Sequence, residues 1–149
     1  MIFYFAYGSN QDEGQMKERC PDSKLVGKFV LKDYRLAFSI FSSKRQCGCA
    51  DIIKSPGDEV WGLVYEVSPV DLERLDGFEA HPEKYKRFTT SVENERGETR
   101  TVETYAVVEK SAEHLPPSKE YFGIIARAAE TYNFPESYKR FLTSFKILD

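Results

Sequence analysis

The sequence has no long hydrophobic run and no excess of basic residues, and these two shortages exclude two classes of partner. No apolar stretch approaches the roughly 20 residues that a membrane-spanning helix needs, so we expect no membrane partner. The N-terminal stretch MIFYFAYGSN lacks a basic segment and a small-residue cleavage site, so we expect no signal peptide. The formal net charge is -3, whereas nucleic-acid binding needs a basic surface. We therefore expect no nucleic-acid partner.

Cysteine and histidine are also scarce, which argues against disulfide frameworks and metal sites. The three cysteines, Cys20, Cys47 and Cys49, are odd in number and irregular in spacing, unlike those of a secreted disulfide scaffold. Cys47 and Cys49 form a single C-x-C pair without the further ligands that zinc requires. The chain also contains no P-loop, no G-x-G-x-x-G motif and no Ser-His-Asp arrangement. We expect reduced thiols, a cytoplasmic protein and no metal or other cofactor.

The chain does have enough residues for a core and is rich in aromatic side chains. Its 149 residues, of which 41% are hydrophobic and 30% charged, fit one globular domain spanning residues 1–149. Eleven Phe and nine Tyr predict an aromatic core or pocket.

Hydrophobic periodicity and turn residues place most strands before most helices. We predict strands over residues 2–7, 25–31, 34–41, 50–54, 60–67, 85–92 and 99–108. Helices are predicted over residues 12–19 and 69–77, after Pro117 and after Pro135. The turn sequence of residues 55–58, SPGD, predicts a hairpin between strands 50–54 and 60–67. This order is typical of an α+β fold, and favours a small closed or nearly closed barrel flanked by helices.

The stretch FAYGSN, residues 5–10, breaks the first predicted strand with a flexible polar turn. Gly8 permits close approach of a ligand to the backbone, while Ser9 and Asn10 add side-chain donors. A turn from a strand into a helix concentrates free N–H groups, so Tyr7, Gly8, Ser9 and Asn10 are candidates for binding a carboxylate or an oxyanion. The alternative is an ordinary turn in which Asn10 caps the helix.

A second candidate is the stretch LDGFE, residues 75–79, at the expected end of a helix. Gly77 is expected to end that helix, and Phe78 to point inward as an anchor. Glu79 would then lie at the rim of the pocket, where aromatic surface disfavours its charged form and raises its pKa, as a general base requires. The alternative is an exposed loop glutamate.

Two tyrosines are weaker candidates. Tyr85 can hydrogen-bond a substrate or be a buried structural tyrosine, and Tyr121 can line a pocket or simply begin a helix. His81 and His114 have no obvious partners in sequence, and we expect both at the surface.

Together, these stretches resemble the γ-glutamylcyclotransferase family, which shares its fold with the AIG2-like proteins. The resemblance spans nearly the whole chain, and its motifs are FAYGSN (5–10), SPGDEVWG (55–62), LDGFE (75–79), Tyr85 and PPSKEY (116–121). It implies a small mixed β-barrel flanked by helices. It also implies an enzyme of the lyase or acyltransferase type, independent of metal, that cyclises a γ-glutamyl amide to 5-oxoproline and releases the free amine.

The resemblance also implies roles for individual residues. Glu79 would be the catalytic acid/base, residues 7–10 would hold the γ-glutamyl group, and Tyr85 and Tyr121 would line the pocket. The expected partner is a small γ-glutamyl substrate, and the oligomeric state, monomer or homodimer, is open. The leaving amine is open as well: an α-amino acid, the ε-amine of lysine or a γ-glutamylated metabolite. The alternative function is a non-catalytic module of the same fold that binds small carboxylates.

Overall fold

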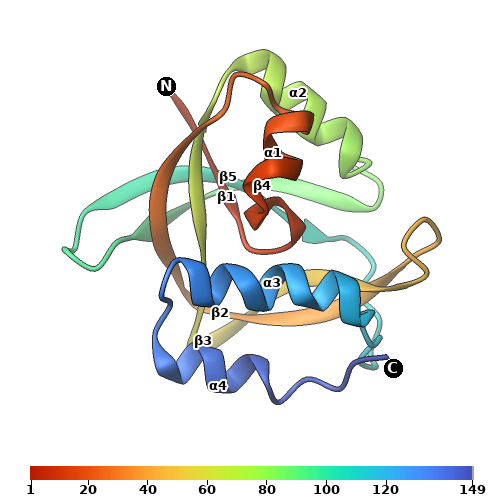
Figure 1. Ribbon diagram of the computed structural model, residues 1–149. Coiled ribbons are helices and arrows are strands. Elements are labelled where there is room, and N and C mark those ends of the chain that lie inside the picture. The colour runs from red at the N-terminus through yellow and green to blue at the C-terminus, as the bar shows by residue number, and fades with distance from the viewer. Residues whose placement is uncertain (149) are drawn as a thin grey trace.

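Five strands close into a barrel, and four α-helices lie outside it (Figure 1). The computed structural model describes residues 1–148. The elements in chain order are β1 (Ile2–Ala6), the single 3₁₀ turn η1 (Ser9–Gln11), α1 (Glu13–Arg19), β2 (Lys24–Ser42), β3 (Cys47–Val67), α2 (Pro69–Phe78), β4 (Tyr85–Glu93), β5 (Thr99–Val107), α3 (Lys119–Thr131) and α4 (Glu136–Leu142).

The barrel is mixed, as the family resemblance predicted. Its strand order is β1-β3-β2-β4-β5, closed by the pairing of β5 with β1. That closing pair is parallel, with Tyr4 opposite Glu103, while the other neighbours are antiparallel. The α+β barrel predicted from the sequence is therefore confirmed.

The hairpin predicted at residues 55–58 is wrong, because β3 is one continuous strand through this segment. Both halves of β3 pair with β2, in the registers Lys32 with Glu59 and Tyr34 with Lys54. The turn sequence forms an irregularity in the ladder, where Gly57 adopts φ 88° and its N–H donates to Asp33 Oδ1 at 3.0 Å. The two strands predicted over 25–31 and 34–41 are likewise one strand, β2, because Asp33 absorbs the bend with φ 66°.

Helix α2 begins where the sequence predicted and ends later. Ser68 and Asp71 form a capping box, in which Asp71 N–H donates to Ser68 Oγ at 3.0 Å and Ser68 N–H donates to the Asp71 carboxylate at 3.3 Å. Gly77 does not end the helix. Ala80, with φ 50°, takes the left-handed conformation that a glycine at the end of a helix usually adopts. Glu79 is consequently the C-terminal capping residue of α2.

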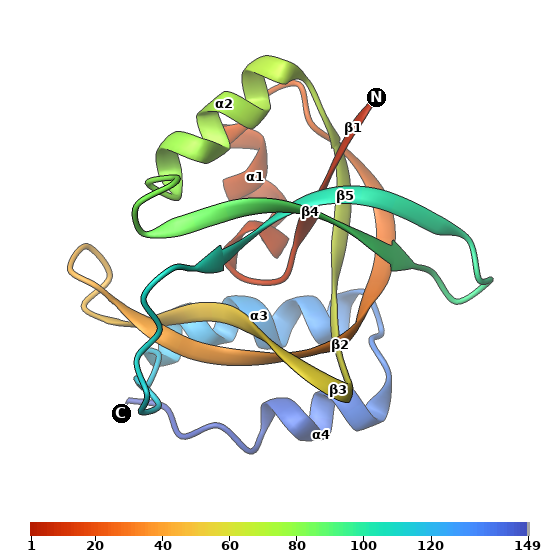
Figure 2. The same ribbon diagram turned by 180° about the vertical axis from the view of Figure 1, so that it is seen from behind.

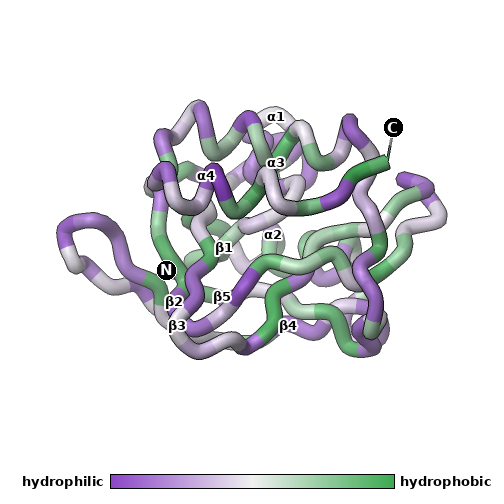
Figure 3. The backbone as a smooth tube through the Cα atoms, turned by 90° about the horizontal axis from the view of Figure 1, so that it is seen from below, coloured by the Kyte–Doolittle hydropathy of each residue, from purple (hydrophilic) through white to green (hydrophobic). Residues whose placement is uncertain are grey.

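The remaining helices pack against the barrel through apolar faces. Ser118 caps α3, whose buried residues are Tyr121, Ile125, Ala128 and Ala129. Figure 2 shows β4 and β5 crossing the back of the molecule, away from α3 and α4. The turn between β4 and β5 projects from the body and is hydrophilic (Figure 3). Within residues 1–148, no helix combines the length and apolarity needed to cross a membrane.

Candidate active site

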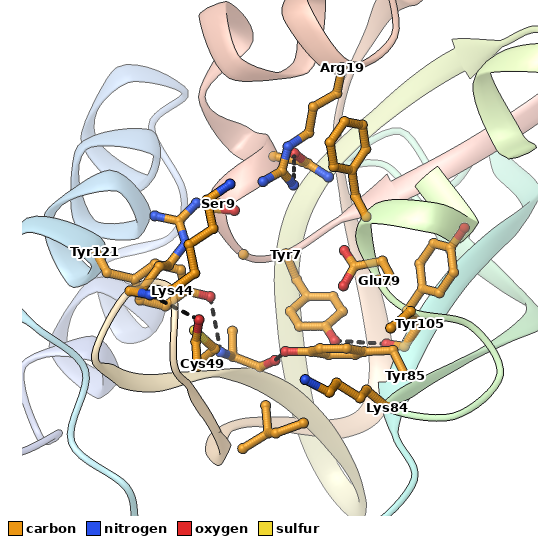
Figure 4. A pocket seen from close by; sticks show the side chains of 18 of the residues that line it. Tyr7, Ser9, Arg19, Lys44, Cys49, Glu79, Lys84, Tyr85, Tyr105 and Tyr121 are labelled. Carbon is orange, nitrogen blue, oxygen red and sulfur yellow. Dashed lines mark hydrogen bonds between the residues drawn. The ribbon is translucent and has the colours of Figure 1, made fainter. Parts of the chain in front are cut away.

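A cavity of about 280 Å³ opens at one end of the barrel (Figure 4). It brings together all seven residues that the sequence singled out, from four separate parts of the chain: Tyr7, Gly8, Ser9, Asn10, Glu79, Tyr85 and Tyr121. A cavity of this size is at the lower end of the range for small-molecule sites.

The loop after β1 presents its backbone N–H groups without protein partners. Within residues 1–148, no group accepts a hydrogen bond from the N–H of Gly8, Ser9 or Asn10. The Gln11 side chain holds this loop in place, because its Nε2 donates to the Tyr7 carbonyl at 2.8 Å and to the Gly8 carbonyl at 3.2 Å. Free N–H groups held rigidly in a concave turn favour an anionic ligand.

Asn10 is buried and does not cap the following helix. Its Nδ2 donates to Tyr4 Oη at 3.0 Å, and its Oδ1 accepts from Gln15 Nε2 at 2.9 Å. Asp12 caps α1 instead, accepting from Gly14 N–H at 3.3 Å. The simple turn in which Asn10 is a helix cap is therefore not the observed arrangement.

Glu79 directs its carboxylate into the cavity, toward Tyr7 (Figure 4). Within the part of the chain that the structure describes, it is the one carboxylate that lines the cavity, and no group donates a hydrogen bond to it. Burial raises the pKa of Glu79 to about 7, although Arg19 and Arg45 act in the opposite direction. A carboxyl with this pKa exchanges a proton near neutral pH, as a general acid/base requires.

Phe78 does not point inward, so this prediction is wrong. Its side chain is 51% exposed, and the guanidinium of Arg19 lies 4.7 Å from the ring centre. Because α2 continues through Phe78, this residue and Glu79 project about 100° apart around the helix axis. Glu79 therefore faces the cavity, and Phe78 lies at its rim.

The three tyrosines around Glu79 have defined hydrogen-bond polarity. Tyr7 Oη donates to the Tyr105 carbonyl at 2.7 Å, and Tyr85 Oη donates to the Ala50 carbonyl at 2.8 Å, so both phenol oxygens can only accept from a ligand. Tyr121 Oη accepts from the Ala50 N–H at 3.0 Å and keeps its own proton to donate. Burial raises the pKa of each of these phenols well above its usual value, so all three stay protonated at neutral pH.

Sequence reasoning missed several other residues that line the cavity: Tyr4, Arg19, Lys44, Arg45, Cys49, Lys84 and Tyr105. Arg19 ends a helix whose start was predicted, but nothing in the sequence shows that its side chain turns back over the loop. Arg45 lies 4.9 Å from the ring centre of Tyr121 and donates to Gln15 Oε1 at 3.0 Å. Both contacts are long-range, so no local pattern encodes them.

The cysteines are free and buried. Burial raises the pKa of Cys49 to about 11 and that of Cys20 to about 12, so both thiols are neutral and weakly nucleophilic at physiological pH. Residues 1–148 contain no group of three or more His, Cys, Asp or Glu side chains that could hold a metal ion. His81 Nδ1 accepts from the Arg87 N–H at 3.0 Å.

Comparison with known proteins identifies the family. The model of the family described as gamma-glutamyl cyclotransferase, AIG2-like, matches residues 4–122. The γ-glutamylcyclotransferases of Bos taurus and Homo sapiens are each 31% identical to this chain over 150 residues, covering 97% of it and 79% of their own length. A solved structure described as gamma-glutamyl cyclotransferase superposes with a TM-score of 0.91 at 30% identity, covering 99% of this chain and 89% of that one. The chain belongs to the γ-glutamylcyclotransferase, AIG2-like family, and these relatives support an enzyme of the cyclotransferase type.

Proposed function

We propose that this chain converts a γ-glutamyl amide into 5-oxoproline and a free amine, with Glu79 as the general acid/base. The observation that carries the proposal is the Glu79 carboxylate, which has a pKa of about 7, no hydrogen-bond donor within residues 1–148, and a position in the same cavity as the free N–H groups of the Tyr7–Asn10 loop. The relatives named γ-glutamylcyclotransferase support the same reaction type.

The reaction requires two proton transfers at one position. Glu79 removes a proton from the substrate's α-ammonium, and the neutral amine attacks the γ-carbonyl carbon to form the ring C–N bond. The tetrahedral intermediate then collapses with cleavage of the original amide C–N bond, while the Glu79 carboxylic acid returns the proton to the leaving nitrogen. The ring nitrogen releases its second proton to solvent, and the freed amine takes up one proton from solvent to leave as an ammonium. Because the attack is intramolecular, holding the glutamyl chain in a folded conformation supplies much of the rate.

The hydrogen-bond polarity of the cavity suits the two ends of a γ-glutamyl group. The phenol oxygens of Tyr7 and Tyr85 accept and therefore suit the α-ammonium, while the Tyr121 hydroxyl donates. The N–H groups of Gly8, Ser9 and Asn10 suit a carboxylate or the developing oxyanion.

The charges at the cavity favour a substrate with a net negative charge. Four cationic side chains line the cavity, namely Arg19, Lys44, Arg45 and Lys84, against the single carboxylate of Glu79. A γ-glutamyl amino acid carries a net charge of about -1 at neutral pH, whereas the ε-amide of lysine adds a second ammonium and is close to neutral. Electrostatic complementarity therefore favours the α-amino acid among the three alternatives that the sequence left open.

Mass spectrometry of 5-oxoproline tests the reaction. Incubation with γ-glutamyl-alanine is expected to release 5-oxoproline and alanine in equal amounts, with turnover unaffected by EDTA. Tight binding of γ-glutamyl-alanine without any 5-oxoproline would instead favour the non-catalytic carboxylate-binding module. Turnover that EDTA abolishes and zinc restores would contradict the proposed mechanism.

We expect kcat/KM for γ-glutamyl-alanine to be at least about tenfold higher than for Nε-(γ-glutamyl)lysine. A difference of about 1.4 kcal/mol in transition-state binding is enough to produce this ratio. The double variant Lys44→Gln/Arg45→Gln is expected to reduce this ratio by raising KM for the first substrate. The matched control is Lys86→Gln, on the exposed side of β4. An unchanged substrate ratio in the double variant would refute the role of these two cations.

The pH dependence of kcat/KM is expected to follow the Glu79 carboxyl. Because its pKa is raised to about 7, the basic form needed for the first proton transfer is lost as the pH falls below 7. The value of kcat/KM should therefore fall about tenfold per pH unit below the midpoint. A midpoint between about pH 4 and 5, typical of an exposed glutamate, would show that Glu79 does not control the reaction.

A further inference from the structure

The wall of the cavity includes an open strand edge. Residues 48–52 of β3 pair with β2 on one side only, and within residues 1–148 no strand pairs with their other edge. Loop and side-chain groups cover that edge instead: Gly48 N–H donates to the Pro116 carbonyl at 3.0 Å, and Ala50 bonds to Tyr121 and Tyr85 through its N–H and its carbonyl. The barrel therefore has a seam at the cavity, between residues 48–52 of β3 and the end of the β4–β5 hairpin.

The side chain of Asp51 crosses this seam. It is 0% exposed, and its two oxygens receive four hydrogen bonds. Oδ1 accepts from the N–H groups of Ile52 and Val107, both at 2.8 Å. Oδ2 accepts from Ser39 Oγ at 2.6 Å and from Lys110 Nζ at 2.8 Å. Four donors, one of them the Lys110 ammonium, satisfy this buried carboxylate, whose burial would otherwise be costly.

The hydrogen bond from Val107 to Asp51 joins the same two parts of the barrel as the hydrogen bond from Tyr85 to Ala50. Asp51 follows Ala50, whose backbone bonds to both Tyr85 and Tyr121. Val107, the last residue of β5, lies opposite Tyr85 in the β4–β5 ladder. The Asp51–Val107 bond therefore fixes the separation between Ala50 and the strand that carries Tyr85.

We propose that Asp51 is a positioning residue, which holds the seam at the width that orients the Tyr85 and Tyr121 hydroxyls toward the substrate. The structural part of this proposal stands on the contacts above, and its kinetic part rests on the proposed function. The charge is required because four donors converge on the side chain. An asparagine in the same place has one amide oxygen and would present its NH2 group to a donor.

The test is Asp51→Asn, with Ser39→Ala as the matched control. Ser39→Ala removes a bond to the same carboxylate from the β2 side and leaves the contact across the seam intact. At a temperature well below both melting points, Asp51→Asn is expected to lower kcat tenfold or more, because small misplacements of orienting groups are costly in rate. Ser39→Ala is expected to keep kcat within about twofold, and neither variant should move the pH midpoint set by Glu79.

Amide hydrogen exchange provides a readout that is independent of turnover. Exchange at Ala50 and Val107 is expected to accelerate in Asp51→Asn and to stay unchanged in Ser39→Ala. Unchanged exchange in a folded Asp51→Asn variant would refute the seam role, as would equal losses of kcat in both variants. If exchange accelerates in Asp51→Asn but the wild-type protein shows no turnover, only the proposed function is refuted, and the role of Asp51 in the seam stands.

If Asp51→Asn does not fold, the variant Lys110→Met is used for the same test. The Lys110 side chain is 35% exposed, so its loss leaves the carboxylate with three donors and an intact core. We expect faster exchange at Val107 and a smaller loss of kcat, and the absence of both effects would overturn the proposal.

Discussion

Glu79→Gln is expected to lower kcat by about 10²–10⁴ and, above pH 7, to raise the melting temperature. Glutamine keeps the size of the side chain, but it neither accepts the ammonium proton nor returns one to the leaving amine. Because two proton transfers depend on the same group, the loss should lie toward the upper end of this range. Single-turnover rates at saturating substrate measure the effect.

The expected gain in stability follows from the raised pKa. The folded-state pKa of about 7 lies above the ordinary value of 4.5, so the wild-type carboxyl is protonated at no cost below about pH 4.5. Between these two values the folded state holds a proton that the unfolded state releases, and stability falls until the pH exceeds about 7. The full penalty is on the order of 3 kcal/mol, and Gln avoids it because it has no charge. The stability difference between variant and wild type should thus appear at pH 8 and vanish near pH 4.

Glu83→Gln is the control for Glu79→Gln, because Glu83 is an exposed carboxylate of the same loop. It should change neither turnover nor the pH dependence of stability. If the Glu79→Gln variant melts normally and retains turnover within a few-fold of wild type, Glu79 is not the base. If its melting temperature shows no crossover with pH, the carboxyl is solvated and its pKa is ordinary.

Gly48→Ala is expected to destabilise the protein by about 1–3 kcal/mol or more, because it overfills a closely packed position. An added Cβ would lie 1.8 Å from the Leu115 carbonyl oxygen, a distance that no rotamer change relieves because the clash is with backbone. Residues 115–117 must then move away from β3, which breaks the Gly48–Pro116 hydrogen bond and displaces Ser118 and Tyr121. We therefore expect a loss of turnover together with the loss of stability, measured by urea unfolding at constant m-value.

Gly77→Ala is the matched control, with the opposite expected sign. Gly77 lies inside α2, and no heavy atom is within 4 Å of an added Cβ. Alanine in a helix interior is favoured over glycine by roughly 0.5–1 kcal/mol, so this variant should be more stable than wild type. A Gly48→Ala variant as stable as Gly77→Ala would show that the Leu115 segment yields easily.

Features that depend on neighbouring residues could be predicted from the sequence. Helices α2 and α3 begin where the sequence predicted, because their Ser68 and Ser118 caps involve only the next three residues. The family motifs similarly indicated a barrel and the seven candidate site residues, which the structure brings into one cavity.

Features that depend on distant pairing could not be predicted. The sequence SPGD favours a turn locally, but β2 supplies a continuous partner for β3 on both sides of it, and the ladder overrides the local preference. The inward position of Glu79 depends on α2 ending one residue after Gly77, and the bond of Asp51 to Val107 joins residues that are 56 positions apart. No local pattern contains this information.

On the proposed function, the turn between β2 and β3 places the preference for the leaving amine in a different part of the fold from the proton-transfer chemistry. Lys44 and Arg45 lie in this turn, at the tip of two long strands, whereas Glu79 follows a helix elsewhere in the chain. Surface turns tolerate changes of length and sequence far better than strands do. If Lys44 and Arg45 recognise the leaving amine as proposed, changes confined to residues 43–46 alter the amine preference and leave the proposed proton transfer by Glu79 unchanged. Grafting such tips between relatives is a direct route to new amine specificities.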